Sequence, residues 1–470
     1  MSDVTTSTGI PAAPPPALSA ASPIPVRTMP TFGEALRVWL RIGLLSFGGP
    51  AGQIALMHRE VVDERAWVGD GRFLHALNFC TLLPGPEAQQ LATYLGWLMH
   101  GVRGGLAAGV LFILPGALVM LALSLVYWSL GDVPLVAALF FGLKAAVLVL
   151  VIEALLRVGG RALKGPAPWA LAGAAFLALF VFSVPFPFVV LAAALAGFLA
   201  PDAFAPMKHG AAHSDTPALL DAMLIADPGR PAHLAQGARR AGLVALALWL
   251  APVALLALLA PGTYADVAWF FSKMAVVTVG GAYAVLAYVA QEAVEGYSWL
   301  SGPEMLAGLG LAETTPGPLI LVLQFVGFLA GARAPEALSG LAGGVIASAL
   351  VLWVTFAPCF AFVFLGAPLV ERLQANRKLA SALAAVTAAV VGVIANLALW
   401  FGLRVLFKEL RHVTLGPVTL DLPVLASLDW RALVLAAIAA LCLFRFRLGL
   451  LRTLAVGAVA GLGLGYVGGL

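Results

Sequence analysis

The chain has 470 residues, of which 61% are apolar and only 11% are charged, and its mean hydropathy is +0.99. Because a water-soluble domain carries about 25% charged residues, this composition excludes a soluble domain and predicts an integral membrane protein. The net charge of +4 comes from short basic clusters between apolar runs, which argues against nucleic-acid binding and predicts signals of membrane orientation.

Long apolar runs follow an N-terminal stretch rich in Pro, Ala, Ser and Thr, residues 1–30, which predicts a disordered tail. A bilayer core takes about 20 helical residues to cross. On that basis we predict membrane segments at about 34–57, 73–99, 105–129, 134–156, 167–183, 185–200, 241–260, 268–290, 305–330, 338–370, 380–402, 431–444 and 449–470. The polar stretch at 202–240 predicts a cytoplasmic linker. The expected fold is therefore all-α and polytopic.

An internal repeat at a constant offset of 232 residues divides the chain further, as in many transporters built from two related halves. We predict an N-terminal repeat at 31–201 and a C-terminal repeat, with its leading helix, at 241–470. The offset aligns Arg41 with Lys273, Ser46 with Thr278, Gly48 and Gly49 with Gly280 and Gly281, Glu60 with Glu292, Trp67 with Trp299, and Pro84, Gly85 and Pro86 with Pro316, Gly317 and Pro318.

Loop charges predict that the two repeats have inverted topology. The loop at 58–72 contains Arg59, Arg65 and Arg72, whereas its counterpart at 291–304 contains glutamates and no Lys or Arg. Basic loops stay cytoplasmic, so the two copies are expected to face opposite sides of the membrane. The sequence leaves open whether the broken segments are re-entrant, with about nine crossings, or all cross, with about thirteen.

The two Pro-Gly-Pro motifs lie inside apolar runs, where they remove backbone donors and interrupt helical geometry. Each run is therefore expected to form two half-helices. The half-helix after each break directs unpaired N–H groups and a partial positive charge at the break, which attracts anions. The candidate donors are the amides of Glu87, Ala88 and Gln89 and of Leu319, Ile320 and Leu321. The alternative is that each motif is only a kink or a tight turn.

Other polar features of these runs are candidates for the same site. Gly48 and Gly49 with Gly280 and Gly281 provide either close helix packing or backbone amides for a ligand. Arg41 and Lys273 provide either a positive field for an anion or cations that snorkel to lipid headgroups. Ser46, Thr278 and Thr315 add hydroxyl groups beside the breaks.

The remaining ionisable residues suggest structural roles. Glu60 and Glu292 are expected in solvated loops, and Lys144 and Glu153, in one apolar run, are expected to neutralise each other or to relay protons. His209 and His213 fall in the linker, and we expect neither a metal site nor any other cofactor. The sequence contains no phosphate-binding loop, nucleophile elbow or zinc motif, which argues against an enzyme.

These motifs together resemble the chromate ion transporter family, whose long members carry two related domains. The resemblance rests on the motif from Ser46 to Pro50, on Trp67, on the motif from Leu83 to Leu91, and on the motif from Thr314 to Pro318, and it covers about 32–470. It implies gradient-driven efflux of chromate, a tetrahedral dianion, across a bacterial inner membrane, and hence chromate resistance.

Two other functions stay open at this stage. A permease for sulfate or another oxyanion would need the same shape and charge complementarity. An enzyme acting on a lipid-linked phosphate would use the same amides, but no paired nucleophile and base can be named for it. The expected partners are the oxyanion and the lipid bilayer, and the sequence does not decide whether the chain forms homo-oligomers.

Overall fold

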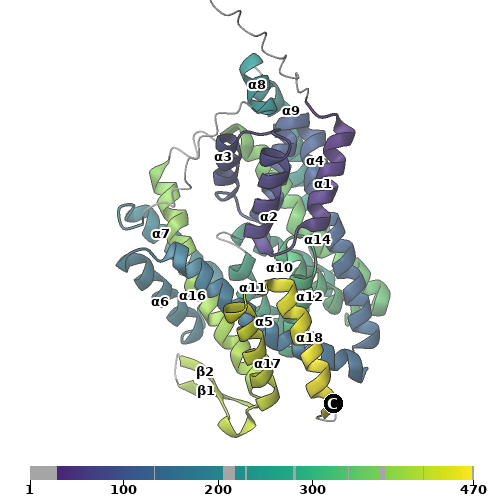
Figure 1. The fold of residues 1–470 in the computed structure, drawn as a ribbon, viewed down its shortest axis with the longest axis vertical. Helices are drawn as coiled ribbons and strands as arrows, with labels where there is room; N and C mark the ends of the chain where they lie inside the picture. Colours follow the sequence, from purple (N-terminus) through teal and green to yellow (C-terminus); the bar gives the residue numbers. More distant parts are fainter. Residues whose placement is uncertain are drawn as a thin grey trace, which may run out of the picture.

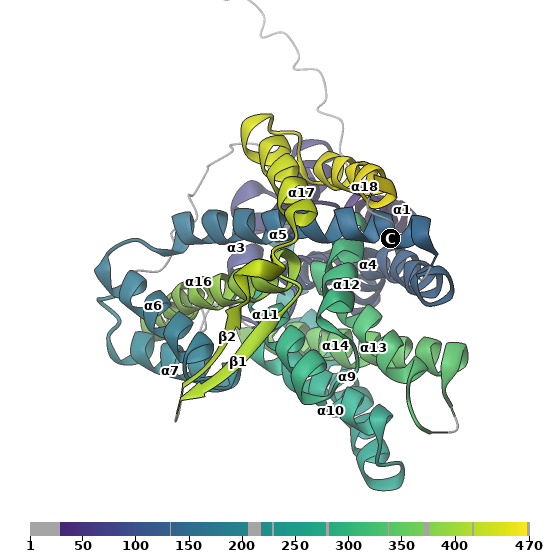
Figure 2. The ribbon, with the colours of Figure 1, turned by 90° about the horizontal axis from the view of Figure 1, so that it is seen from below.

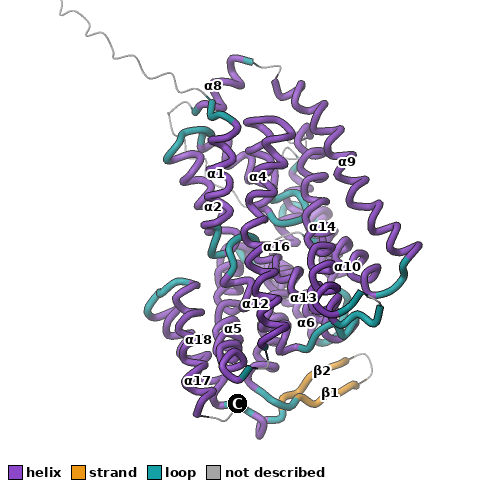
Figure 3. Tube along the Cα trace, turned by 90° about the vertical axis from the view of Figure 1, so that its right-hand side faces the viewer, coloured by secondary structure: helices purple, strands orange, loops and turns teal. Residues whose placement is uncertain are grey.

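The computed structural model describes residues 29–131, 133–204, 218–227, 230–278, 282–336, 338–369, 376–415 and 418–467, and it is almost entirely helical (Figures 1 and 3). Gly280, Gly281, His209 and His213 lie outside the described residues, as do residues 1–28 of the predicted tail. Helix α8 lies at one end of the molecule and the β1–β2 hairpin at the opposite end (Figure 1).

The first part of the chain forms helices of two kinds, short ones separated by breaks and longer ones that run through the molecule. They are α1 (Phe32–Leu45), α2 (Gly49–His58), the π-helix η1 (Arg59–Asp63), α3 (Asp70–Cys80), α4 (Glu87–Leu130), α5 (Pro134–Ala162), α6 (Pro166–Phe180) and α7 (Phe186–Leu199). After α8 (Leu219–Ala226) comes α9 (Arg230–Leu259).

The second part repeats the alternation of short and long helices. It contains α10 (Thr263–Val277), α11 (Ala282–Gln291), the π-helix η2 (Glu292–Gly296), α12 (Gly302–Thr314), the 3-10 turn η3 (Leu319–Leu321), α13 (Val322–Ala332), α14 (Gly340–Gly366), the 3-10 turn η4 (Ala367–Leu369) and α16 (Arg377–Leu406). The antiparallel strands β1 (Leu410–Leu415) and β2 (Val418–Pro423), the 3-10 turn η5 (Leu425–Ser427), α17 (Trp430–Ala440), the π-helix η6 (Leu441–Arg445) and α18 (Leu450–Val467) follow.

Five of the described helices are long and apolar enough to cross a membrane: α4, α5, α9 from His233 to Leu259, α14 and α16. α4 is not one straight rod, because Gly101 has φ +64° and the backbones of Gly96 and Gly104 lie against each other. Its first part therefore folds back on residues 102–130. α5 packs against α12, α16, α17 and α18, and α14 packs against α4, α9, α10 and α13 (Figure 2).

Both runs with a Pro-Gly-Pro motif are broken into two helices, which confirms the prediction of half-helices. The two runs with a Gly-Gly pair, for which the sequence left packing and backbone opening as alternatives, are broken as well. The breaks fall between α1 and α2, α3 and α4, α10 and α11, and α12 and η3. The backbone after the first break of each half repeats at the 232-residue offset. Ala66 and Ser298 both have positive φ, +50° and +54°. The N–H of Trp67 donates to Val61 O at 2.8 Å, and that of Trp299 donates to Ala293 O at 2.9 Å. The orientation of the halves across the bilayer stays a prediction.

The stretch predicted as a linker contains regular structure at its C-terminal end. α8 lies within it, and α9 already begins at Arg230. α8 docks on the first half, because the N–H groups of Leu219 and Leu220 donate to Ala66 O and Trp67 O and Asp221 pairs with Arg72.

Candidate functional site

The two Pro-Gly-Pro loops are each joined to the opposite half of the chain by a backbone hydrogen bond. The N–H of Gly85 donates to Thr278 O, and the N–H of Gly317 donates to Ser46 O, both at 2.8 Å. These bonds are equivalent under the 232-residue offset. Both glycines are buried and have positive φ, +117° and +94°, a conformation that other residues rarely adopt. We call the two loops and the residues they bind the crossing; from here on the word refers to this contact between the halves and not to a membrane span.

The carbonyl groups that accept these bonds lie where α1 and α10 end. Ser46 and Thr278 are the C-caps of the two helices, and both are buried. Their hydroxyl groups donate back into the last helical turn, to Ile42 O at 2.6 Å and to Met274 O at 2.5 Å. Because each helix ends at this residue, the carbonyl of the capping residue has no donor within its own helix and is available for the opposite loop.

The helices that begin at the breaks have N-termini without side-chain caps. α2 begins after Gly48, α4 after Pro86 and η3 after Pro318, and none of these three N-cap residues accepts a hydrogen bond through a side chain. α5, α6 and α7 also lack a side-chain cap, whereas α1 begins with a capping box at Thr31 and α12 begins with one at Ser301. The amides of Glu87, Ala88 and Gln89 thus open α4 as predicted, whereas the N–H of Leu321 already donates to Pro318 O at 3.0 Å. Uncapped helix starts of this kind favour an anion.

Buried glutamines surround the crossing, and the sequence reasoning missed two of them. The Nε2 group of Gln53 donates to Gly317 O at 2.5 Å, and that of Gln90 donates to Pro84 O at 2.6 Å. Gln89 binds Thr93 Oγ1, and Gln324 donates to Ala117 O. Gln53 and Gln324 were overlooked although each is a polar residue in an otherwise apolar run, which was the available signal.

Three of these side-chain amides have an oxygen atom that accepts no hydrogen bond. Within the described residues, the buried Oε1 atoms of Gln89, Gln90 and Gln324 have no partner. A buried amide oxygen without a donor is costly, so these positions are suited to ordered water or to a ligand that brings a donor.

Neither cation selected from the sequence is seen to touch the crossing. The side chain of Arg41 is 55% exposed, and its Nε lies 3.2 Å from Oε1 of Glu60. Lys273 is also exposed, and its Nζ lies 5.7 Å and 5.8 Å from the ring centres of Phe270 and Tyr288. Among the described residues, no hydrogen bond or ion pair links Arg41 or Lys273 to either Pro-Gly-Pro loop.

The expectation that Glu60 lies in a solvated loop is wrong. Its side chain is fully buried, and it lies between Arg41 and Arg65, whose Nη1 is 2.6 Å from Oε2 of Glu60. η1 carries the side chain inward, because the extra residue in its turn rotates the helix surface. Its counterpart Glu292 is half-buried.

A second ionisable cluster lies beside the second loop. Glu313, buried in the last turn of α12, accepts a hydrogen bond from Tyr283 OH at 2.7 Å. Thr315, also buried, donates its hydroxyl to Leu311 O. The expectation that Lys144 and Glu153 neutralise each other is wrong, because Glu153 pairs with Arg157 at 3.4 Å, one helical turn away on α5. The alternative role in proton relay stays a prediction.

Comparison with known proteins decides the family. The family described as chromate transporter matches residues 33–198 and 265–462. The chain belongs to the chromate transporter family. A chromate transport protein from Pseudomonas aeruginosa is 34% identical over 360 residues, which cover 76% of this chain and 77% of the relative. A chromate transport protein from Cupriavidus metallidurans is 26% identical over 382 residues, 81% of this chain and 85% of the relative.

Membership agrees with the composition and with the long apolar helices, and the chain is an α-helical, multi-pass membrane protein. A probable chromate transport protein from Synechococcus elongatus is 26% identical over 369 residues, 77% of this chain and 82% of the relative. No solved structure matches the chain. The first residues of the two matched segments, 33 and 265, are separated by the same offset that relates the two Pro-Gly-Pro loops.

Proposed function

We propose that this protein is a secondary transporter that exports chromate across the bacterial inner membrane and thereby confers chromate resistance. The observation that carries the proposal is the crossing, where two loops of repeated sequence, each with a buried glycine, are bonded to the opposite half beside uncapped helix starts. The names of the relatives, which are chromate transport proteins, agree with it.

We place the anion at the crossing, with backbone amides as its main ligands. Pro84, Gly85, Pro86, Glu87 and Gln89 form the first side of this site, with Ser46, Gly48 and Gly49 next to them, and Thr315, Pro316, Gly317 and Pro318 form the second, next to Thr278, Gly280 and Gly281. The partial charge of a helix N-terminus, about half a unit, stabilises an anion without the desolvation cost of burying a full cation. Arg41 and Lys273, which lie on exposed faces, contribute at most a longer-range field.

The direction of transport follows from the charge of the substrate. A dianion that leaves a cell with a negative interior releases about 4.6 kcal/mol per 100 mV, from about 2.3 kcal/mol per charge. Efflux therefore runs with the membrane potential. In an inverted-repeat transporter, the two loops would exchange access to the two sides of the membrane as one half rocks against the other.

The test measures chromate flux in proteoliposomes that contain the purified full chain, with the membrane potential set by a potassium gradient. We expect chromate to move towards the positive side, with a rate that rises with the potential. Equal sulfate flux at the same driving force would remove the chromate assignment, and no flux of either anion would overturn the transport function.

A pair of glutamine variants connects this flux to the crossing. Gln53→Leu leaves the carbonyl of Gly317 without its side-chain donor, a loss of about 1–3 kcal/mol, so we expect a roughly tenfold or larger fall in flux. Gln291→Leu is the control, because Gln291 is half-buried at the end of α11 that points away from the break. If both variants transport at the wild-type rate, the crossing is not the site.

A further inference from the structure

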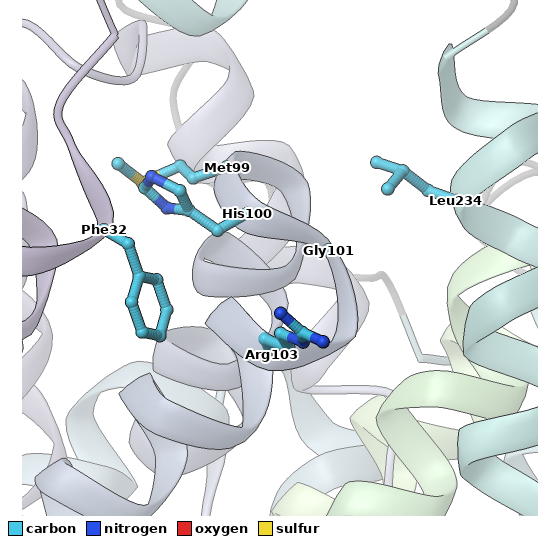
Figure 4. A pocket seen from close by; sticks show the side chains of 6 residues that line it. All are labelled: Phe32, Met99, His100, Gly101, Arg103 and Leu234. Atoms are coloured by element: carbon cyan, nitrogen blue, oxygen red, sulfur yellow. The ribbon is translucent and has the colours of Figure 1, made fainter.

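A groove on the outer surface of the first half runs along the seam between α1 and α4. It begins in a cavity of about 510 Å³, lined by Phe32, Met99, His100, Gly101, Arg103 and Leu234 (Figure 4). A second cavity, of about 380 Å³, is lined by Leu36, Arg37, Leu40, Ala107, Val110 and Leu111.

The two cavities lie one after the other because α1 and residues 102–130 of α4 run side by side in the same direction. The rings of Phe32 and His100 are 5.7 Å apart at one end of the seam. Eleven residues further along both helices, Gly43 packs against the backbone of Leu111. Since a helix rises about 1.5 Å per residue, Arg37 and Arg103 lie about 7.5 Å and about 4.5 Å along the seam from the Phe32–His100 contact.

These two arginines differ from most of the other arginines in the first half, although Arg161 on α5 is likewise exposed and has no carboxylate within 4.0 Å among the described residues. Arg37 and Arg103 are exposed, and within the described residues neither lies within 4.0 Å of a carboxylate. The nearest acid on α1, Glu34, is held by its hydrogen bonds to Thr31. The arginines that do pair with acids are Arg41, Arg59, Arg65, Arg72 and Arg157.

Beyond the two guanidinium groups the groove is apolar. Leu40 and Val110 are 40% and 46% exposed on its two walls, and Leu44 and Leu114 extend the same two walls by one turn. The two unpaired cations are suited to the anionic phosphate of a phospholipid, and the apolar groove beside them is suited to its acyl chain. A free oxyanion would use only the cations and leave the apolar part of the groove unexplained.

We propose that this groove binds one anionic phospholipid, with its phosphate between Arg37 and Arg103 and an acyl chain along Leu40 and Val110. The net negative charge of the headgroup selects it over zwitterionic lipid. The site is separate from the crossing and does not depend on the proposed transport function.

The test is a titration of the detergent-solubilised full chain with phosphatidylglycerol, in which bound lipid is counted by native mass spectrometry. We expect one tight adduct and much weaker binding of phosphatidylcholine. Arg37→Gln with Arg103→Gln should weaken phosphatidylglycerol binding roughly 25-fold, from roughly fivefold per arginine, which is about 1 kcal/mol each. Arg59→Gln is the control, because Arg59 is also exposed but already pairs with Glu64.

A third variant tests the apolar part separately. Ala107→Trp fills the groove and keeps both arginines, so it should also remove the tight adduct. The proposal is overturned if the double arginine variant binds phosphatidylglycerol as the wild type does, if phosphatidylcholine binds equally well, or if inorganic phosphate at the same concentration displaces the lipid.

Discussion

Substitution of Gly85 by alanine gives the sharpest test of the crossing. Gly85 has φ +117°, and its N–H makes the bond to Thr278 O. An added Cβ would lie 2.7 Å from Sγ of Cys359 and 2.9 Å from Nε2 of Gln90, closer than real Cβ contacts. The loop would have to move away from both neighbours, which would stretch the bond between the halves.

The cost of this change has two parts. The backbone conformation of an alanine at this φ costs about 1–3 kcal/mol. Overpacking against Cys359 and Gln90 adds about 1–3 kcal/mol. Gly165→Ala is a matched control, because Gly165 has φ +101° but nothing within 4 Å of an added Cβ. The control should carry only the first part of the cost.

The assay compares the unfolding midpoint in detergent with chromate flux in proteoliposomes. We expect Gly85→Ala to lose flux severely and Gly165→Ala to keep it, at similar levels of insertion. Adding Cys359→Ala to Gly85→Ala removes one of the two close contacts and should restore part of both quantities. Equal flux in Gly85→Ala and Gly165→Ala would refute the reasoning that a tight crossing is required.

Two further predictions concern ion pairs outside the crossing. Glu60→Gln removes the buried carboxylate that faces Arg65, so it should lower the apparent free energy of unfolding by about 3 kcal/mol. Glu64→Gln, at a half-exposed position, should change this free energy little. Equal effects of the two variants on unfolding in detergent would contradict the prediction. Burial raises the pKa of Glu304, but hydrogen bonds from Arg333 and Ser301 outweigh it, so the pKa is lowered. The ion pair therefore stabilises the protein fully above the usual carboxyl pKa, and this stability is lost as the pH falls through the lowered pKa. Arg333→Gln should therefore lower the unfolding midpoint at pH 7 but not below about pH 3, and a pH-independent difference would count against the ion pair.

The breaks could be predicted from the sequence because their causes are local. A proline lacks an N–H and a glycine allows positive φ, so Pro84, Gly85 and Pro86 interrupt a helix wherever the segment lies. The equal spacing of the second motif then predicted that both halves contain the same interruption. The amide donors that open α4 followed from the same local rule.

The contacts of polar side chains could not be predicted, because they depend on which segments meet in three dimensions. Glu60 is buried because η1 and Arg65 enclose it, and no local pattern distinguishes that from a solvated loop. Gln53 reaches Gly317 across 264 positions of sequence. The β1–β2 hairpin was missed because apolar runs dominated the reading, although Val413, Thr414 and Thr419 are residues that favour strands.

The two bonds at the crossing are made by main-chain atoms alone, and this limits what mutation can do to them. Replacing the side chain of either acceptor residue, Ser46 or Thr278, leaves the accepting carbonyl in place. The neighbouring side chains differ between the two halves, for example Pro50 against Ala282 and Gln89 against Leu321. The joint between the duplicated units is thus tolerant of sequence drift, and it is vulnerable chiefly to changes that alter the shape of the backbone itself.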